Sequence, residues 1–75
     1  MSRVTSLAKL HVPLGGQDVE LQEIDFDVGE GALPLLRTRI REGKRFTVFD
    51  IDPASARAWG EALLAWASRR EAPDA

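Results

Sequence analysis

The sequence contains no cysteine and no tyrosine, and it has one histidine and one methionine. Without cysteine there can be no disulfide framework, no thiolate nucleophile and no cysteine-ligated metal site. This composition suits a reducing compartment, and we expect a cytoplasmic protein. No apolar run approaches the roughly 20 residues of a membrane-spanning helix, and the first residues lack the apolar core of an export signal. We therefore expect neither secretion nor a membrane anchor.

The length of 75 residues predicts one domain, which we place at residues 1–75. A domain of this size buries only about 60% of its unfolded surface, so a partner chain would add stability. Hydrophobic residues make up 44% and charged residues 29%, as is typical of globular proteins. The net charge of −2 is unevenly distributed, because an acidic block at residues 18–30 precedes a basic block at residues 31–48.

The clearest predicted element is a helix over residues 53–70. Asp52 can accept hydrogen bonds from the first turn, and Pro53 suits the first helical position, where no N–H is needed. Apolar residues recur at helical spacing, and they place Trp59, Ala62, Leu63 and Trp66 on one face. We expect both tryptophans to pack on a sheet formed by the preceding residues.

Alternating apolar and polar residues predict four strands, at about residues 4–12, 19–28, 35–41 and 44–50. Neighbouring strands usually pair, which gives the order 1-2-3-4. The polar residues 71–75 are expected to fray. The predicted fold is α+β: a four-stranded antiparallel β-meander followed by one C-terminal helix packed on one sheet face, in the order β-β-β-β-α.

Turn residues predict how the first two strands pair. A two-residue loop at Gly15 and Gly16 sets Val12 opposite Val19. Along the second strand, the apolar residues change parity after Leu21. This change predicts either a β-bulge near residues 22–23 or a strand that crosses from one packing surface to another.

The last two strands form a second hairpin. A three-residue loop at residues 41–43, with Gly43 in the left-handed position, sets Thr38 opposite Phe46. This register collects apolar side chains on one face, namely Leu36, Ile40, Phe46 and Val48. The arginines then lie on the other face.

Positive charge gathers in this hairpin. The candidate anion-binding residues are Arg37, Arg39, Arg41, Lys44 and Arg45, because a basic ribbon can neutralise the phosphates of nucleic acid. The net charge and the lack of interleaved aromatic residues argue against nucleic-acid binding. The outward carboxylates of the second strand are Glu23, Asp25 and Asp27. If they lie beside Arg37 and Arg39, they cancel much of the positive field, and this placement separates the two interpretations.

No catalytic, cofactor or metal signature is present. His11 is the only histidine, and no second titratable group is tied to it by spacing. Asp50 and Asp52 are explained by the positive start of the helix rather than by metal ligation. The glycine pairs do not match a phosphate-binding loop. We expect no enzymatic activity, no cofactor and no bound metal.

The predicted helix is more apolar than a helix on one sheet requires, because Arg57 and Glu61 leave only a narrow polar stripe. The candidate interface residues are Trp59, Leu63, Leu64 and Trp66, with Leu35 and Phe49 as a second patch on the arginine side. An alternative is that the alanine-rich flanks merely favour helix formation. The expected partner is a second copy in a two-fold homodimer, or an unidentified protein.

The segment RIREGKRFTVFDIDPASARAWGEALLAWA resembles the C-terminal part of many small bacterial proteins of unknown function. Those proteins end in a strand, an Asp-Pro or similarly capped start and an alanine-rich helix. The resemblance implies a small bacterial cytoplasmic protein and assigns no activity and no functional residues. We therefore favour a non-enzymatic protein-interaction module or accessory subunit, which can form a homodimer. The alternative is a nucleic-acid-binding or phosphate-binding accessory protein that uses the basic hairpin.

Overall fold

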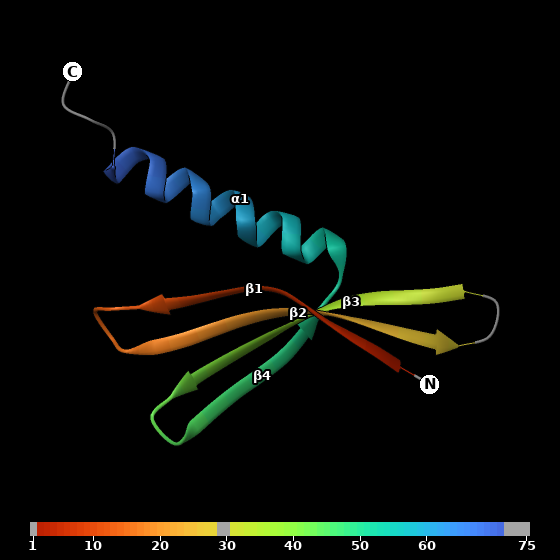
Figure 1. Cartoon of the computed structure of the whole chain (residues 1–75). Coiled ribbons are helices and arrows are strands. Elements are labelled where there is room, and N and C mark those ends of the chain that lie inside the picture. The colour runs from red at the N-terminus through yellow and green to blue at the C-terminus, as the bar shows by residue number, and fades with distance from the viewer. Residues whose placement is uncertain (1, 29–30, 72–75) are drawn as a thin grey trace.

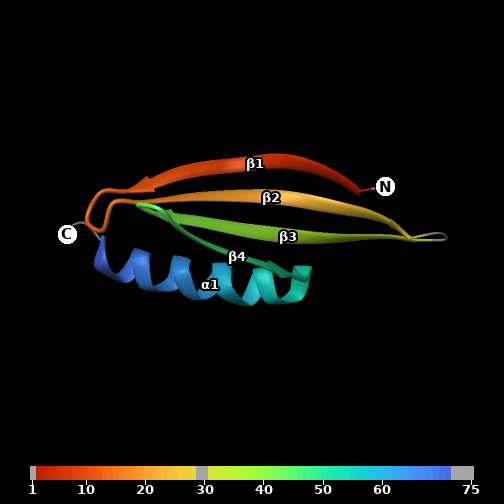
Figure 2. The ribbon, with the colours of Figure 1, turned by 90° about the horizontal axis from the view of Figure 1, so that it is seen from below.

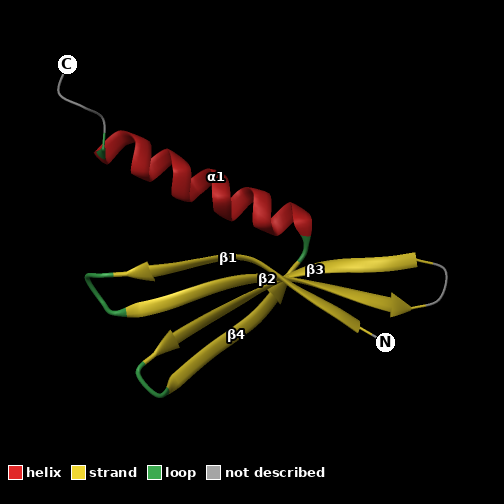
Figure 3. Ribbon diagram, viewed as in Figure 1, coloured by secondary structure: helices red, strands yellow, loops and turns green. Residues whose placement is uncertain are grey.

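The computed structural model describes residues 2–28 and 31–71 (Figure 1). Its elements are β1 (Ser2–Val12), β2 (Gln17–Val28), β3 (Gly31–Glu42), β4 (Arg45–Ile51) and α1 (Pro53–Arg70). The strands form one antiparallel sheet in the order β1-β2-β3-β4 (Figure 3). The predicted α+β class and element order are confirmed. Residues 72–75 of the tail that we expect to fray lie outside the described residues.

Helix α1 begins at the predicted capping residue. The Asp52 carboxylate accepts hydrogen bonds from the Ser55 backbone N–H at 3.3 Å and from the Ser55 hydroxyl at 2.5 Å. Pro53 stands in the first turn, where its missing N–H costs nothing. At the other end, the Glu71 N–H donates to the Ala67 carbonyl at 2.8 Å. Local side-chain and backbone chemistry thus accounts for both ends of the helix.

The β1–β2 turn is longer than predicted. Val12 pairs with Gln17, so residues 13–16 form the loop, and the predicted pairing of Val12 with Val19 is wrong. Gly16 has a φ of +75° and donates its N–H to the Val12 carbonyl at 2.8 Å, which closes the turn one residue before Gln17. Because the register differs by two residues, each side chain near the turn keeps its predicted face.

The irregularity in the first hairpin lies in β1 rather than in β2. The register shifts between Ser6 and Ala8, so Leu7 is the extra residue of a β-bulge. Strand β2 pairs with β3 without any shift. The predicted bulge near residues 22–23 is therefore wrong, and the alternative is correct: β2 crosses from one packing surface to the other.

The β3–β4 turn is shorter than predicted. Glu42 pairs with Arg45, so Gly43 and Lys44 form a two-residue loop. Gly43 has a φ of +59°, as a type II′ turn requires at its first loop position. The predicted register differs from the observed one by an odd number of residues, and β4 therefore shows the opposite faces. Phe46 and Val48 lie on the arginine side, whereas Thr47, Phe49 and Ile51 lie on the other side.

The single chain has a small hydrophobic core and an extended shape. It measures 53 × 30 × 15 Å, and its radius of gyration is 15.2 Å, against about 11 Å for a compact domain of this length. Among the residues whose burial is described, Ile24 is the one buried hydrophobic residue, at 1% exposed, and Thr38 is the one buried polar residue, at 0%. The sheet is strongly twisted, so its two ends face different directions (Figure 1).

Helix α1 runs along the sheet but diverges from it toward the C-terminus (Figures 1 and 2). Near its start, the Trp59 ring lies 5.9 Å from the Phe49 ring, centroid to centroid. No residue of α1 is buried, and Trp66 is 58% exposed. Trp59 therefore packs on the sheet as predicted, although it is not buried, and the prediction is wrong for Trp66.

Candidate functional site

The strand register divides the side chains between two sheet faces. Alternation along β3 places Arg37, Arg39 and Arg41 on one face, here called the arginine face. The opposite face carries Phe49, which contacts α1, and is here called the helix-side face. In β2, Asp18, Glu20 and Gln22 lie on the arginine face, and Val19, Leu21, Glu23 and Asp25 lie on the helix-side face.

On the arginine face, Arg37 forms a two-pronged ion pair with Asp50. Arg37 Nε donates to Asp50 Oδ1 at 2.8 Å, and Arg37 Nη2 donates to Asp50 Oδ2 at 3.0 Å. These hydrogen bonds raise the pKa of Arg37 and lower the pKa of Asp50. Asp50 thus neutralises an arginine of the neighbouring strand rather than acting at the helix start.

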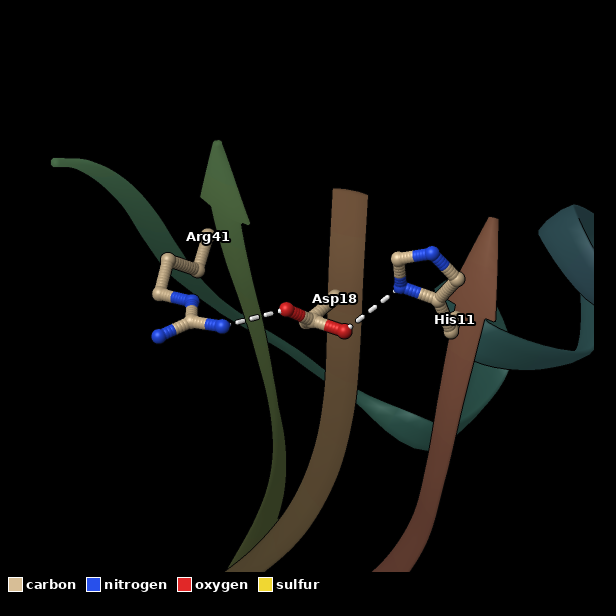
Figure 4. A network of polar contacts seen from close by, with 3 residues as sticks. All are labelled: His11, Asp18 and Arg41. Carbon is tan, nitrogen blue, oxygen red and sulfur yellow. Dashed lines mark hydrogen bonds and ion pairs between the residues drawn. The ribbon is translucent and has the colours of Figure 1, made fainter. Parts of the chain in front are cut away.

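At the end of the sheet near the two short turns, Asp18 joins β1 to β3 (Figure 4). Arg41 Nη2 donates to Asp18 Oδ2 at 2.6 Å, and His11 Nδ1 lies 2.8 Å from Asp18 Oδ1. Because a carboxylate only accepts hydrogen bonds, Nδ1 carries the proton in this contact. The hydrogen bonds from Arg41 and then His11 lower the pKa of Asp18.

Glu20 occupies the middle of the same charged face. The Ser6 hydroxyl donates to Glu20 Oε2 at 2.8 Å, and Arg39 Nη1 lies 3.7 Å from Glu20 Oε1. The bond from Ser6 is the main reason that the pKa of Glu20 is lowered. Arg39 also lies over the Phe46 ring, with its guanidinium carbon 4.7 Å from the centroid. Both contacts hold Arg39 against the sheet.

The acidic residues expected beside the arginines lie elsewhere. Glu23 pairs with Leu36 and Asp25 with Pro34, on the helix-side face, so these two residues do not lie beside Arg37 and Arg39 and do not neutralise them. Asp27 pairs with Ala32 in the register, and its side chain lies outside the described residues. The arginines are instead neutralised by Asp18, Glu20 and Asp50. These carboxylates lie on the same face as the arginines, which can be read from the sequence only when the strand registers are known.

The remaining candidate anion-binding residues lie at the β3–β4 turn, with Lys44 in the loop and Arg45 opposite Glu42. In residues 2–28 and 31–71, neither forms an ion pair. An open recess of about 580 Å³ lies nearby. Its polar lining includes Lys9, His11, Asp18, Glu20, Arg39 and Arg41, together with the Phe46 ring. Because most of these charges already pair with one another, the recess offers little unbalanced positive charge to a phosphate.

The helix-side face carries an apolar patch near the short turns. Its members are Leu10, Val19, Leu21, Ile40 and Phe49, which lie side by side across the four strands. Leu10 is 52% exposed and Phe49 is 38% exposed, so α1 covers this patch incompletely. We define this set as the sheet patch, which the sequence did not predict because its members come from all four strands.

The candidate interface residues of α1 are all exposed. Leu63 is 56% and Leu64 69% exposed, and Trp59 is the one with an aromatic partner in the described part of the chain. Gly60 lies between them, and a methyl group built there would meet no atom within 4 Å. The chain's own sheet therefore does not contact the helix at this point. Trp59, Leu63, Leu64 and Trp66 are defined here as the helix patch.

Leu35 and Phe49 do not form one patch. Leu35 pairs with Ile24 on the arginine face, and Phe49 pairs with Thr38 on the helix-side face. The prediction that both lie on the arginine side is therefore wrong, and its cause is the register of β4. Leu35 is half-buried beside Ile24, and Phe49 belongs to the sheet patch.

In the described part of the chain, no three or more histidine, cysteine, aspartate or glutamate side chains are grouped so that they could hold a metal ion. Within residues 2–28 and 31–71, no helix combines the length and hydrophobicity needed to cross a membrane. The charged contacts of the arginine face are ion pairs and hydrogen bonds at the surface. His11 and Asp18 form a pair, but they lie on an exposed face of the sheet.

Comparison with known proteins adds a family but no activity. No curated protein and no solved structure shows significant similarity to this chain. A model of a family of unknown function, DUF6967, matches residues 1–69, which covers every strand and nearly all of α1. The chain belongs to the DUF6967 family of unknown function.

Proposed function

We propose that this chain is a small non-enzymatic interaction module, or accessory subunit, of the cytoplasm. Its helix patch and sheet patch together form one apolar surface that another polypeptide covers. The observation that carries this proposal is the exposure of the large apolar side chains, set against the single buried hydrophobic residue among those described. Contiguous exposed apolar surface of this kind is typical of protein–protein interfaces.

The total surface area supports the same conclusion. The chain exposes 6239 Å², whereas a compact monomer of 8.3 kDa exposes about 4,600 Å². The excess is roughly 1,600 Å², and a standard interface buries about 800 Å² on each partner. The chain therefore has ample surface for a stable interface.

The composition of the surface also favours protein binding. Tryptophan is strongly enriched among the residues that dominate binding energy, and both tryptophans of the chain belong to the helix patch. On the arginine face, three arginines pair with carboxylates of the same chain. Those ion pairs reduce the positive field that a phosphate backbone would require.

Oxidative footprinting of the protein inside the cells that produce it tests this proposal. The measured quantity is the modification rate of Trp66 relative to His11. His11 lies on the arginine face, and its side chain is 57% exposed, close to the 58% of Trp66. We expect strong protection of Trp66 and none of His11. If Trp66 reacts at the rate of a half-exposed tryptophan, nothing covers the surface, and the proposal is overturned.

A further inference from the structure

We infer that the covering polypeptide is a second copy of this chain, and that α1 of each copy lies on the sheet patch of the other. This inference rests on the proposed function and names the partner that it leaves open. A two-fold arrangement of this kind buries both patches of both chains at once.

The two patches are complementary in type. The helix patch needs an apolar sheet to cover it, and the sheet patch needs an apolar helix. One chain carries both patches, but its own α1 diverges from the sheet and leaves open space at Gly60. A second copy supplies the missing helix and the missing sheet together, whereas a foreign partner would have to supply both separately. Two-fold dimers are also the commonest homo-oligomers.

The short connection between β4 and α1 limits how the helix can lie on its own sheet, which it contacts near its start. Strand β4 ends at Ile51 and α1 starts at Pro53, so Asp52 is the single linking residue. Asp52 is also the helix cap, and Pro53 has a restricted φ, so this link has little freedom to bend. Short hinges of this kind favour the exchange of an element between copies.

The surface area that a compact dimer would bury lies in the range found for obligate homodimer interfaces. Two separate chains expose about 12,500 Å², on the basis of 6239 Å² each, and a compact protein of twice the mass exposes about 7,600 Å². Association would therefore bury about 4,900 Å² in total, and obligate interfaces bury about 2,000–5,000 Å² or more.

Charge does not oppose this arrangement. The helix patch is apolar. Helical spacing places Arg57 and Glu61 on the side of α1 away from Trp59, Leu63 and Trp66, whereas Leu64 lies beside them. The five residues of the sheet patch are apolar as well. The arginine face, in contrast, satisfies much of its charge by internal ion pairs and stays outside the proposed interface. The apolar surfaces can therefore meet without burying an unpaired charge.

Sedimentation equilibrium of the full chain, with Leu63→Glu and Leu10→Lys as variants, tests this inference. We expect wild-type protein to sediment at twice the mass of one chain. Each variant alone should associate at least about 100-fold more weakly, because two charged residues enter each dimer and each tenfold loss corresponds to about 1.4 kcal/mol. Leu14→Lys is the matched control, since Leu14 is 99% exposed and lies in the β1–β2 loop. It should remain dimeric.

Mixing the two variants distinguishes helix exchange from other dimers. A mixed dimer pairs the intact helix of the Leu10→Lys chain with the intact sheet patch of the Leu63→Glu chain. We therefore expect dimer mass to return on mixing, and helical ellipticity to return as well if the separate variants do not fold. A helix-to-helix or sheet-to-sheet dimer gives no such recovery.

The outcomes separate this inference from the proposed function. A wild-type monomer at all concentrations, or a mixture without recovery, overturns the exchanged dimer. If Trp66 is nevertheless protected in cells, a different polypeptide covers the surface and the proposed function stands. If Trp66 is unprotected as well, both fail.

Discussion

Ile24 and Thr38 are buried on opposite faces of the sheet, and each is enclosed for a different reason. Ile24 pairs with Val4 and Leu35 on the arginine face, next to the pair of Gln22 and Arg37. Thr38 pairs with Leu21 and Phe49 on the helix-side face, beneath the start of α1. Within the described residues, the Thr38 hydroxyl has no hydrogen-bond partner. These two positions therefore respond differently to substitution.

Replacing Ile24 with alanine should lower the free energy of unfolding by about 2–5 kcal/mol, because it removes buried methyl groups and leaves a cavity. Urea unfolding monitored by circular dichroism measures this change. Leu14→Ala is the control, since Leu14 is 99% exposed, and it should stay within about 0.5 kcal/mol of wild type. Equal effects at both positions would contradict the burial of Ile24.

Replacing Thr38 with valine should raise the free energy of unfolding by roughly 1 kcal/mol, because it removes a buried hydroxyl without a partner and keeps the shape. Thr38→Ser keeps the hydroxyl and loses a methyl group, so it should be destabilising. Thermal unfolding of the two variants gives the comparison. A destabilised valine variant would show that the hydroxyl has a partner in the assembled protein.

The carboxylates of the arginine face predict acid sensitivity. Hydrogen bonds from Arg37, from Arg41 and from Ser6 lower the pKa values of Asp50, Asp18 and Glu20, whose ordinary values are 3.8, 3.8 and 4.5. A lowered folded-state pKa gives stability that is present above the ordinary value and lost as the pH falls through the folded value. We therefore expect the urea concentration at the unfolding midpoint to decrease when the pH is lowered below about 4.5.

The Asp50→Asn variant assigns part of this acid sensitivity to the ion pair with Arg37. It should be less stable than wild type at pH 7, and its urea midpoint should fall less steeply toward pH 3. Glu23→Gln is the control, because Glu23 lies on the other face and forms no ion pair in the described part of the chain. A wild-type slope in the Asp50→Asn variant would show that other carboxylates carry the acid dependence.

At the scale of the elements, α1 depends on its cap more than on packing, since none of its residues is buried. Most of the stability of a helix in a protein comes from packing of its apolar face, and α1 buries none of its residues in this chain. The hydrogen bonds from Ser55 to Asp52 lower the pKa of Asp52 and satisfy the first turn. The start of the helix is therefore a sensitive position.

Asp52→Ala should reduce helical ellipticity and lower the unfolding midpoint, because the first turn loses its acceptor. Asp52→Asn should retain most of both, since asparagine is an equally good capping residue. Far-UV circular dichroism of the two variants measures the difference. If both variants lose ellipticity equally, the charge at this position matters more than its capping hydrogen bonds.

The second hairpin shows that the pairing register of two strands is not determined by the strands alone. In the second hairpin, one loop residue more or fewer exchanges the faces of β4, and Gly43 can serve either a two-residue or a three-residue loop. The cross-strand pairs that separate such registers contribute only about 0.2–1 kcal/mol each. The predicted register placed Phe46 and Val48 on the apolar face. In the structure Phe46 lies on the arginine face, where Arg39 packs on its ring.

At the scale of the whole molecule, the chain is extended and open, with a radius of gyration of 15.2 Å. The helix patch is exposed, and α1 covers the sheet patch of its own chain only in part. In the proposed dimer, folding and association would be coupled, as they are in obligate homodimers. Stability should depend on concentration for this reason.

We expect the thermal midpoint of the wild-type chain to rise with protein concentration, because association of two chains stabilises the folded state by mass action. Scanning calorimetry over a wide range of concentrations measures this shift. The Leu63→Glu variant should show no such rise, since its helix patch carries a charge. A concentration-independent midpoint in the wild type would indicate a chain that folds by itself.

Features that depend on neighbouring residues could be predicted from the amino-acid sequence. Asp52 and Pro53 mark the start of α1, and alternation marks four strands, because capping and side-chain direction act within a few residues. The contacts between residues of different strands are known only from the three-dimensional structure. The arginines pair with Asp18, Glu20 and Asp50 because two registers place them so, and Trp66 is exposed because α1 diverges from the sheet toward its C-terminus. Such contacts join residues far apart in the chain, and small differences in turn geometry determine them.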